Sequence, residues 1–184
     1  MNTLFTTMDS PLGPLLLTSD GEALTGVFMV EHKHGPQIAA EWIRDEQAPP
    51  LVEARRQLAA YFDGTLTQFD LRLAPSGTPF QQRVWQELRT IGFGETLSYG
   101  ELARRIGSPN ASRAVGLANG RNPLSIVVPC HRVIGANGKL TGYGGGIDRK
   151  ATLLDFEAEV LRSNTASQTN PDRNSNPTTL DLFQ

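Results

Sequence analysis

Cysteine occurs once in the 184 residues, at position 130, and this limits how the chain can be held together. One cysteine cannot form an internal disulfide or supply the cysteine pairs of a structural zinc site. The fold must therefore depend on a hydrophobic core, for which the hydrophobic content of 39% suffices. The longest apolar runs fall well short of the roughly 18 residues of a membrane-spanning helix, and residues 1–5 do not open a signal peptide. We expect a cytoplasmic globular protein of one domain or two small ones.

Charge is distributed unevenly along the chain. Residues 1–75 carry 5 basic and 10 acidic residues, whereas residues 76–162 carry 11 and 7. No acid occurs between Glu101 and Asp148, an interval that contains six basic residues: Arg104, Arg105, Arg113, Arg121, Arg132 and Lys139. Such an interval is typical either of a solvated basic face or of a surface that meets a polyanion, and charge alone does not choose between them.

The acidic half predicts a small α+β unit. Apolar runs at 15–17 and 26–30, separated by a turn at 19–21, predict strands. Helices are expected over 36–44 and over 51–62, and the alternation at 69–73 is typical of a half-buried strand. Nothing in this half resembles a site.

The basic half predicts helices first. Thr78, Pro79 and Gln81 form a capping box that opens a helix to about residue 90. Ser98 and Glu101 form a second box, whose helix ends at Gly107, and another helix spans about 110–119. Two short helices joined by a glycine-containing turn predict a helix-turn-helix.

The last third of the chain contains a stretch with predicted secondary structure and then a polar segment. An apolar β-type run at 126–128 and a glycine-rich stretch at 142–146 precede a final helix over about 148–161. In residues 163–184, fifteen side chains are Ser, Thr, Asn, Gln or Pro. Such a segment buries too little apolar surface to offset its ordering entropy, so we expect a disordered tail.

Cys130 is the candidate nucleophile, although a lone cysteine is more often an inert core residue. His131 and Arg132 follow it, and cationic or proton-accepting neighbours favour the reactive thiolate. Adjacent residues of a strand point to opposite faces. His131 can therefore act on Cys130 only if Pro129 makes the backbone irregular, or through a bridging water.

The sequence pattern alone does not decide the roles of the other candidate residues. A histidine base needs an orienting partner, and Asp155, Glu157 and Glu159 all lie on the final helix, where a solvated face is the simplest interpretation. Arg113 is a phosphate contact or a solubility charge, and Tyr99 either donates a hydrogen bond or packs. Asn122, followed by a proline, indicates a turn.

Five blocks of sequence, in order, resemble the O6-alkylguanine-DNA alkyltransferases (methylated-DNA–protein-cysteine methyltransferases). The blocks are FGETLSYGELA at 93–103, SRAVG at 112–116, NGRNP at 119–123, IVVPCHRVI at 126–134 and YGGG at 143–146. The resemblance is close over 78–161 and loose over 1–75. It implies an α+β chain with a ribonuclease-H-like domain at 1–75, a catalytic domain with a (winged) helix-turn-helix at 76–162, and the tail at 163–184.

The resemblance also implies a role for each site residue. Cys130 would accept the alkyl group, His131 would act as its base through a water, and Glu157 would orient the histidine. Asn122 would shape the site and Tyr99 would donate to the flipped guanine. The DNA-binding and base-pocket residues would be Ser112, Arg113 as the residue that replaces the flipped base, Ala114, Gly116, Val133 through its carbonyl, Tyr143 and Gly144.

The implied reaction is the irreversible transfer of an alkyl group from O6-alkylguanine in double-stranded DNA, once per molecule, with O4-alkylthymine as an additional candidate substrate. A monomer without cofactor or membrane association is expected. Some members of the family bind zinc in the N-terminal domain, but this chain has no second cysteine, and its other histidines are His32 and His34, so we expect none. The absence of a four-cysteine domain argues against a transcriptional regulator, and Cys130 argues against the alkyltransferase-like proteins that lack the cysteine.

The end of the tail suggests a second partner. Leu180, Asp181, Leu182 and Phe183 resemble the peptide that binds the bacterial sliding clamp, with Thr179 where glutamine is usual. A chance apolar terminus is the alternative interpretation.

Three classes of function are compatible with the residues alone. The first is a suicidal DNA alkyltransferase, the second a non-catalytic binder of damaged DNA, and the third a cysteine hydrolase. The hydrolase is the weakest, because adjacent Cys130 and His131 on a strand would not touch.

Overall fold

The structure is a computed structural model that describes residues 2–29 and 35–168. His32, His34 and the peptide at 180–183 lie outside the described residues. The elements in chain order are β1 (Leu4–Met8), β2 (Leu15–Ser19), β3 (Leu24–Met29), β4 (Ile43–Arg44), α1 (Pro49–Phe62), α2 (Pro79–Leu88), β5 (Leu97–Ser98), α3 (Tyr99–Arg105), α4 (Ser112–Gly120), η1 (Cys130–Arg132), β6 (Val133–Ile134) and α5 (Ile147–Gln168). The chain is of mixed α+β class, as predicted.

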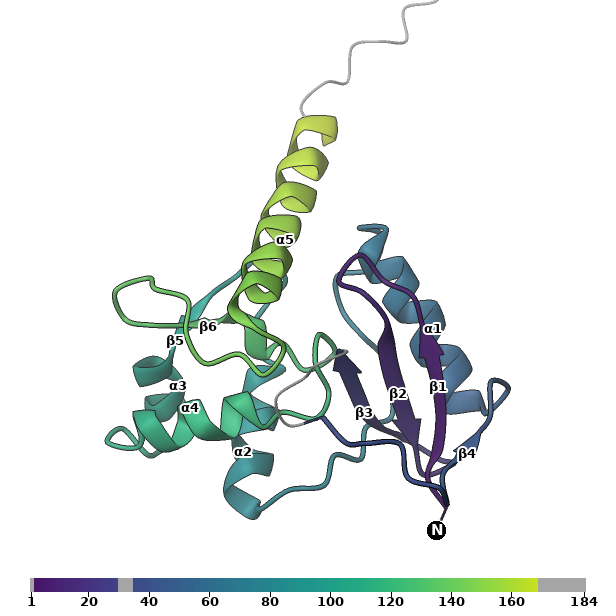
Figure 1. The fold of residues 1–184 in the computed structure, drawn as a ribbon. Helices are drawn as coiled ribbons and strands as arrows, with labels where there is room; N and C mark the ends of the chain where they lie inside the picture. The colour runs from purple at the N-terminus through teal and green to yellow at the C-terminus, as the bar shows by residue number, and fades with distance from the viewer. Residues whose placement is uncertain (1, 30–34, 169–184) are drawn as a thin grey trace, which may run out of the picture.

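The N-terminal half is a sheet covered by one helix. Its four strands lie in the order β3-β2-β1-β4, antiparallel except for the parallel pair of β1 and β4. Helix α1 packs against one face of this sheet (Figure 1), where it buries Leu51, Leu58 and Tyr61 completely. Burial of this apolar face is what fixes α1, because no side chain caps its N-terminus.

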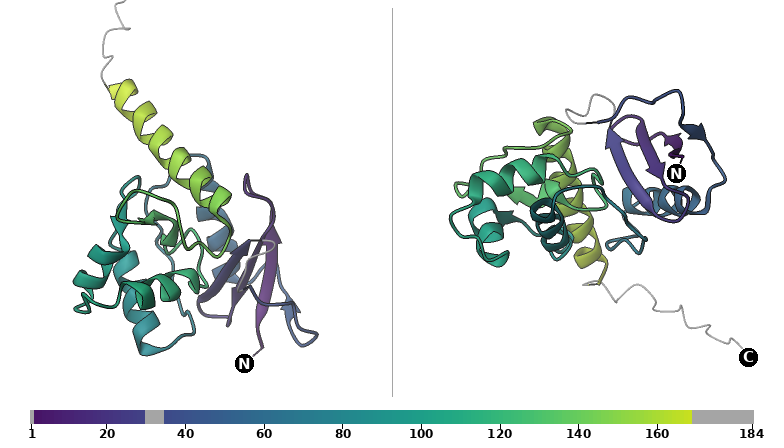
Figure 2. Two further views of the ribbon diagram at one scale, coloured as in Figure 1. Left: turned by 60° about the vertical axis from the view of Figure 1, so that its left-hand side comes forward. Right: turned by 90° about the horizontal axis from the view of Figure 1, so that it is seen from below.

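The C-terminal half is mainly helical. Helices α2, α3 and α4 pack together on one side of the molecule, and the sheet with α1 lies on the other (Figure 2). Helix α5 begins between the two halves, and its C-terminal end projects away from the body (Figure 1). The short parallel pair of β5 and β6 places the start of α3 beside the segment that follows Cys130.

The halves share one hydrophobic core and a backbone junction. Val27 of β3 donates its N–H to the carbonyl of Pro123 at 2.8 Å and accepts from the N–H of Ser125 at 3.1 Å. The chain that leads to Cys130 therefore continues the edge of the N-terminal sheet. No helix within the described residues is long and apolar enough to cross a membrane.

Most predicted helices are present, and their caps explain their limits. The capping box at Thr78 and Gln81 is formed in both directions. Ser98 caps α3 through the N–H of Glu101, but the Glu101 carboxylate pairs with Arg104 instead of completing the second box. Gly107 ends α3 with a φ of 71°, a conformation that glycine adopts without strain.

Two predictions in the acidic half were wrong. Residues 36–42 form no helix, and 43–44 form the edge strand β4, because Ile38 and Ile43 are exposed and no buried face exists to stabilise a helix. The alternating segment 69–73 is not a continuous strand, because only Leu73 pairs, in a single parallel bridge with Leu24 of β3. At Asp70 the Gln57 amide takes the place of a partner strand, accepting from the Asp70 N–H at 2.8 Å and donating to its carbonyl at 2.7 Å.

Two further predictions need correction near the site and the tail. Residues 126–128 are not β-type, because Ile126 has a φ of 73° and the N–H of Val127 bonds back to the Ser125 carbonyl. Helix α5 continues to Gln168, so residues 163–168, assigned to the disordered tail, are helical.

Candidate active site

Cys130 lies at the start of a single 3-10 turn, not on a strand. Pro129 precedes the turn, and Cys130, His131 and Arg132 form it. This irregular backbone removes the objection that adjacent strand residues face apart, because successive side chains of such a turn do not alternate between two faces. Cys130 is 3% exposed, so its sulfur is almost completely shielded from solvent.

Asn122 holds the cysteine from the turn that joins the two halves. Its Nδ2 donates to the Cys130 Sγ at 3.0 Å and to the Val128 carbonyl at 2.8 Å. Its Oδ1 accepts from the N–H of Leu124 at 3.0 Å, and the side chain is buried. The Asn122 amide thus fixes both the backbone before Cys130 and the position of the sulfur.

The Cys130 thiol is protonated at rest. Burial raises its pKa from 9.0 to about 11, against the opposing effects of the Asn122 hydrogen bond and the Lys150 charge. A neutral thiol is a weak nucleophile, since the thiolate is the reactive form. The site therefore needs a base that removes this proton.

His131 has the properties of such a base. It is completely buried, and its Nε2 lies 2.8 Å from the Glu157 Oε1. Burial lowers its pKa below the usual 6.5 of histidine, even though Glu157 acts in the opposite direction, so the imidazole is neutral at pH 7. Because the carboxylate only accepts, Nε2 carries the proton and Nδ1 keeps a free lone pair. Within the described residues that Nδ1 has no hydrogen-bond partner.

The sequence pattern did not show which of three acids on α5 orients His131, and these acids differ in burial. Asp155 and Glu159 are exposed, whereas Glu157 is completely buried. Its carboxylate accepts hydrogen bonds from residues of both halves. The Tyr61 hydroxyl of α1 donates to it at 2.8 Å. The N–H of Gly94 donates at 2.9 Å, and Gly94 has a φ of 74° that brings its backbone to this position.

Arg132 neutralises the buried carboxylate. Its Nε and Nη2 donate to both Glu157 oxygens at 2.9 to 3.2 Å, and its Nη1 donates to the Ile91 carbonyl at 2.6 Å. Burial alone would raise the pKa of Glu157, but the bonds from His131 and Arg132 outweigh it and lower the pKa to about 2. Glu157 is thus ionised at neutral pH.

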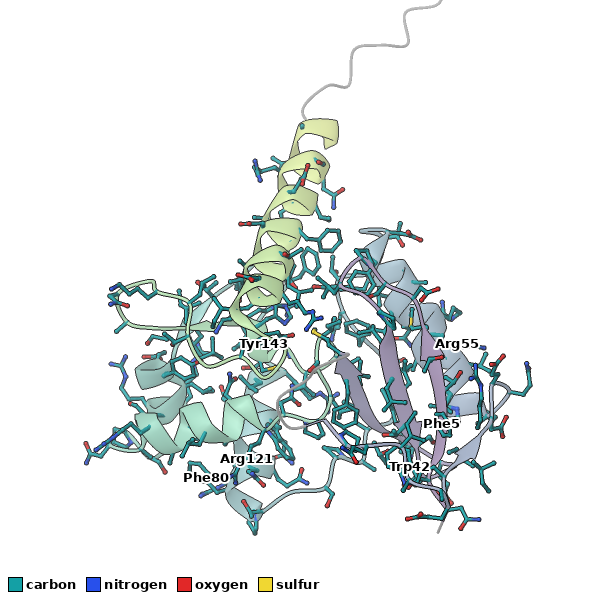
Figure 3. The ribbon with its side chains drawn as sticks, in the orientation of Figure 1. Phe5, Trp42, Arg55, Phe80, Arg121 and Tyr143 are labelled. Carbon is teal, nitrogen blue, oxygen red and sulfur yellow. The ribbon has the colours of Figure 1, made fainter. Side chains whose placement is uncertain are left out.

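The predicted base-pocket residues lie around the segment 141–144. Tyr99, at the start of α3, donates its hydroxyl to the Thr141 carbonyl at 2.8 Å. Tyr143 is 8% exposed, with its hydroxyl 4.0 Å from the Met29 Sδ, and Figure 3 shows it at the junction of the two halves. Gly144 follows it, half-buried. The Val133 carbonyl accepts from the buried Lys150, which leaves one of its two lone pairs for another donor.

The other predicted DNA contacts lie on α4. Its outward face carries Arg113, Ala114, Leu117 and Arg121, all exposed, and Leu117 is 68% exposed. Figure 3 labels Arg121 at the C-terminal end of this helix. Ser112 and Gly116 are half-buried, and Gly116 faces the Tyr99 ring, to which an added Cβ would come within 3.7 Å.

The six basic residues of the acid-free interval do not form one face. Arg132 is buried against Glu157, and Arg104 and Arg105 pair with Glu101. The remaining three, Arg113, Arg121 and Lys139, are exposed and have no carboxylate within 4.0 Å among the described residues. Among these six, the basic side chains without a carboxylate partner thus lie on α4, at its C-terminal end and on the 135–139 turn.

Several residues of the site escaped the sequence analysis. Tyr61, Asn119 and Lys150 are all buried and all bond to it. Asn119 donates to the Cys130 carbonyl at 3.2 Å. A signal existed for one of them, because Lys150 and Glu157 share the helical face of the buried Leu153, where charged residues are unexpected.

Comparison with known proteins covers both halves. The family described as 6-O-methylguanine DNA methyltransferase, ribonuclease-like domain, matches residues 3–75. The family described as 6-O-methylguanine DNA methyltransferase, DNA binding domain, matches residues 79–159. Together they span most of the chain.

Relatives and solved structures agree with these matches. Methylated-DNA–protein-cysteine methyltransferases of Mycobacterium leprae and Methanosarcina acetivorans are 55% and 54% identical, over 86% and 81% of this chain and 94% of each relative. The structure of Mycobacterium tuberculosis OGT in complex with DNA is similar with a TM-score of 0.81 and 55% identity, over 85% of this chain and 94% of that one. The chain therefore belongs to the methylated-DNA–protein-cysteine methyltransferase family.

Proposed function

We propose that this protein repairs DNA by transferring the alkyl group of O6-alkylguanine directly to the Cys130 sulfur, once per molecule. The observation that carries the proposal is the buried arrangement around the thiol: Asn122 holds the sulfur, and the neutral His131, fixed by Glu157, stands next in the chain with a free Nδ1. Relatives with this name and the tuberculosis enzyme in complex with DNA support the same substrate class.

The proposed chemistry balances without a cofactor. His131 removes the thiol proton through a water, and the sulfur lone pair attacks the alkyl carbon in line. An S–C bond forms as the C–O6 bond breaks, and the electron pair of that bond returns to the guanine. Tyr99 donates a proton to the leaving guanine, and the proton taken by His131 replaces it. Nothing in this sequence of steps cleaves the thioether, so each chain reacts once.

The transfer is tested by intact mass spectrometry. After incubation with excess duplex that contains one O6-methylguanine, we expect every chain to gain one methyl group, on the peptide that contains Cys130. Cys130→Ala should gain none and still bind the duplex.

The same experiment separates the three classes of function. Binding of the lesion by the unmodified chain without any mass change would identify a non-catalytic damage binder. Repeated turnover of an ester with no lasting modification would identify a hydrolase. Replacement of O6-methylguanine by O4-methylthymine in the duplex tests the second proposed substrate.

Base flipping is the step that brings the alkyl carbon to a buried sulfur. O6 is inaccessible to a thiol inside a duplex, and extrusion of the nucleotide costs a few kcal/mol. Arg113 projects from the outward face of α4 with no acidic partner among the described residues, and the small Ala114 allows the helix to approach DNA closely. We infer that α4 enters the minor groove and that Arg113 occupies the place of the extruded base, with Ser112 and Gly116 beside it.

Arg113→Ala should slow methyl transfer from duplex by about 10- to 100-fold, as expected if roughly 1.4 to 2.8 kcal/mol of compensation for flipping is lost. Transfer from a single-stranded oligonucleotide should change less than about 3-fold, because no base pair has to be broken. Arg104→Ala is the matched control, an exposed arginine paired with Glu101 on the preceding helix. Equal losses on both substrates would rule out this role for Arg113.

The proposal of a second partner is based on the sequence of the tail alone. We propose that residues 180–183 dock on the sliding clamp, since their sequence Leu-Asp-Leu-Phe resembles the clamp-binding peptide. A peptide of residues 170–184 should bind the clamp in a titration, and Leu182→Ala with Phe183→Ala should abolish binding. No binding of the unmodified peptide would remove the proposal. The expected monomer and the cytoplasmic location, where bacterial DNA lies, stay predictions.

A further inference from the structure

Arg149 connects the N-terminal half to the loop that precedes α5. It lies in the first turn of α5 and is half-buried. Its Nη1 donates to the Gly145 carbonyl at 3.0 Å, and its Nε donates to the Leu12 carbonyl at 3.3 Å. Leu12 belongs to the turn between β1 and β2, 137 residues before Arg149 in the chain. One guanidinium therefore joins three segments: the β1–β2 turn, the loop at 143–146 and α5.

The β1–β2 turn holds the Leu12 carbonyl in place without help from α5. The Ser10 Oγ accepts from the Leu12 N–H at 3.2 Å and donates to the Gly13 carbonyl at 2.6 Å. The Gly13 N–H donates to the Ser10 carbonyl at 2.9 Å, and Gly13 has a φ of 92°. Because a serine side chain and a glycine fix this turn locally, the N-terminal half presents a preformed acceptor to Arg149.

Tyr143 and Gly145 of the same loop also contact β3. The Tyr143 hydroxyl lies 4.0 Å from the Sδ of Met29, the last residue of β3. A Cβ added to Gly145 would come within 2.6 Å of that sulfur and within 2.9 Å of the Tyr143 ring. Packed atoms do not come so close, so any other residue at 145 would displace Met29, Tyr143 or the loop itself. The position of the loop thus depends on the N-terminal half.

The Arg149 guanidinium binds backbone carbonyls and not an acid. Within residues 2–29 and 35–168, no carboxylate lies within 4.0 Å of it. Hydrogen bonds from an ionised donor are roughly twice as strong as neutral ones, so two of them are suited to fixing a loop to a turn. Burial raises the pKa of Tyr143 well above its usual 10, and the Arg149 charge acts in the opposite direction, as expected of a guanidinium near that hydroxyl.

We propose that Arg149 is a positioning residue of alkyl transfer, which ties Gly145, and with it Tyr143, to the N-terminal half and so sets one wall of the base pocket. This role rests on the proposed function and adds to it a part for the β1–β2 turn. Arg149 would touch neither the base nor the reacting carbon. A displaced wall would leave the alkyl carbon out of line with the Cys130 sulfur, and a misplacement of about 1 Å can cost on the order of 100-fold in rate.

The C-terminal half holds the residues just before this loop by separate contacts. Asn119 donates to the Gly142 carbonyl at 3.4 Å, and Tyr99 donates to the Thr141 carbonyl at 2.8 Å. Neither contact involves Arg149, so its loss should free the 143–146 side of the pocket and leave the Cys130 turn in place.

The test compares two reactions of Cys130 in the full-length chain: methyl transfer from a duplex with O6-methylguanine, and alkylation by iodoacetamide. Arg149→Met keeps a long side chain and loses every donor. Its limiting rate of methyl transfer should fall at least about 10-fold, with duplex affinity within about 2-fold. Its rate with iodoacetamide should fall less than about 2-fold, because this small reagent needs no base pocket. Arg162→Met is the matched control, since the exposed Arg162 of α5 donates its Nε to Ala158 of its own helix.

Amide hydrogen exchange follows the loop without DNA. The Gly146 N–H donates to the Tyr143 carbonyl at 3.2 Å, and its exchange should be at least about 10-fold faster in Arg149→Met, with exchange in α4 unchanged. Unchanged methyl transfer, an equal fall of both reactions of Cys130, or faster exchange throughout the chain would overturn the proposal. So would lower duplex affinity at an unchanged limiting rate, which would identify a phosphate contact. If the unmodified protein does not react with O6-methylguanine, the proposed function fails, and hydrogen exchange still decides whether Arg149 fixes the loop.

Discussion

The Glu157 carboxylate is the interaction on which the rest of this structure depends. It accepts hydrogen bonds from Tyr61 of α1, from the backbone of Gly94 and from the His131–Arg132 pair, and it is itself carried by α5. A carboxylate without water is stable only if its charge and its lone pairs are all matched. Four separate segments must therefore reach their final positions together. The N-terminal half, which contributes Tyr61, is in this sense part of the reactive site and not only its support.

This arrangement divides the chemical tasks among buried groups of different charge. Glu157 stays ionised because Arg132 and His131 bind it, and His131 stays neutral because burial disfavours the imidazolium. Cys130 stays protonated because burial raises the pKa of its thiol, and at 3% exposure the thiol is shielded from oxidants in solvent. The protonation state of each group thus depends on its buried neighbours.

The elements whose signals are local were predictable from the sequence. Thr78 and Gln81 predict the start of α2, and Ser98 and Gly107 predict the two ends of α3. These signals are reliable because helix caps and terminal glycines act within one turn of the helix. The segment 69–73 was not predictable, since the Gln57 side chain bonds to the backbone of Asp70 and only Leu73 forms a bridge to β3. The choice of Glu157 over Asp155 and Glu159 came from the family resemblance, because burial is set by packing against the other half. Lys150 was missed although its place on the helical face of the buried Leu153 was a signal in the sequence.

The central claim is that Glu157 holds His131 as a neutral base with its Nδ1 free. Imidazole ¹⁵N chemical shifts measure this directly, and a His32→Gln, His34→Gln variant leaves His131 as the single histidine. A lowered pKa means that the folded protein disfavours the proton, so it loses stability, rather than gaining it, as the pH falls below 6.5. We predict a protonated Nε2 and an unprotonated Nδ1 at pH 7, unchanged as the pH is lowered through 6.5. A proton on Nδ1 at pH 7, or an imidazolium already present above pH 6.5, would contradict the account.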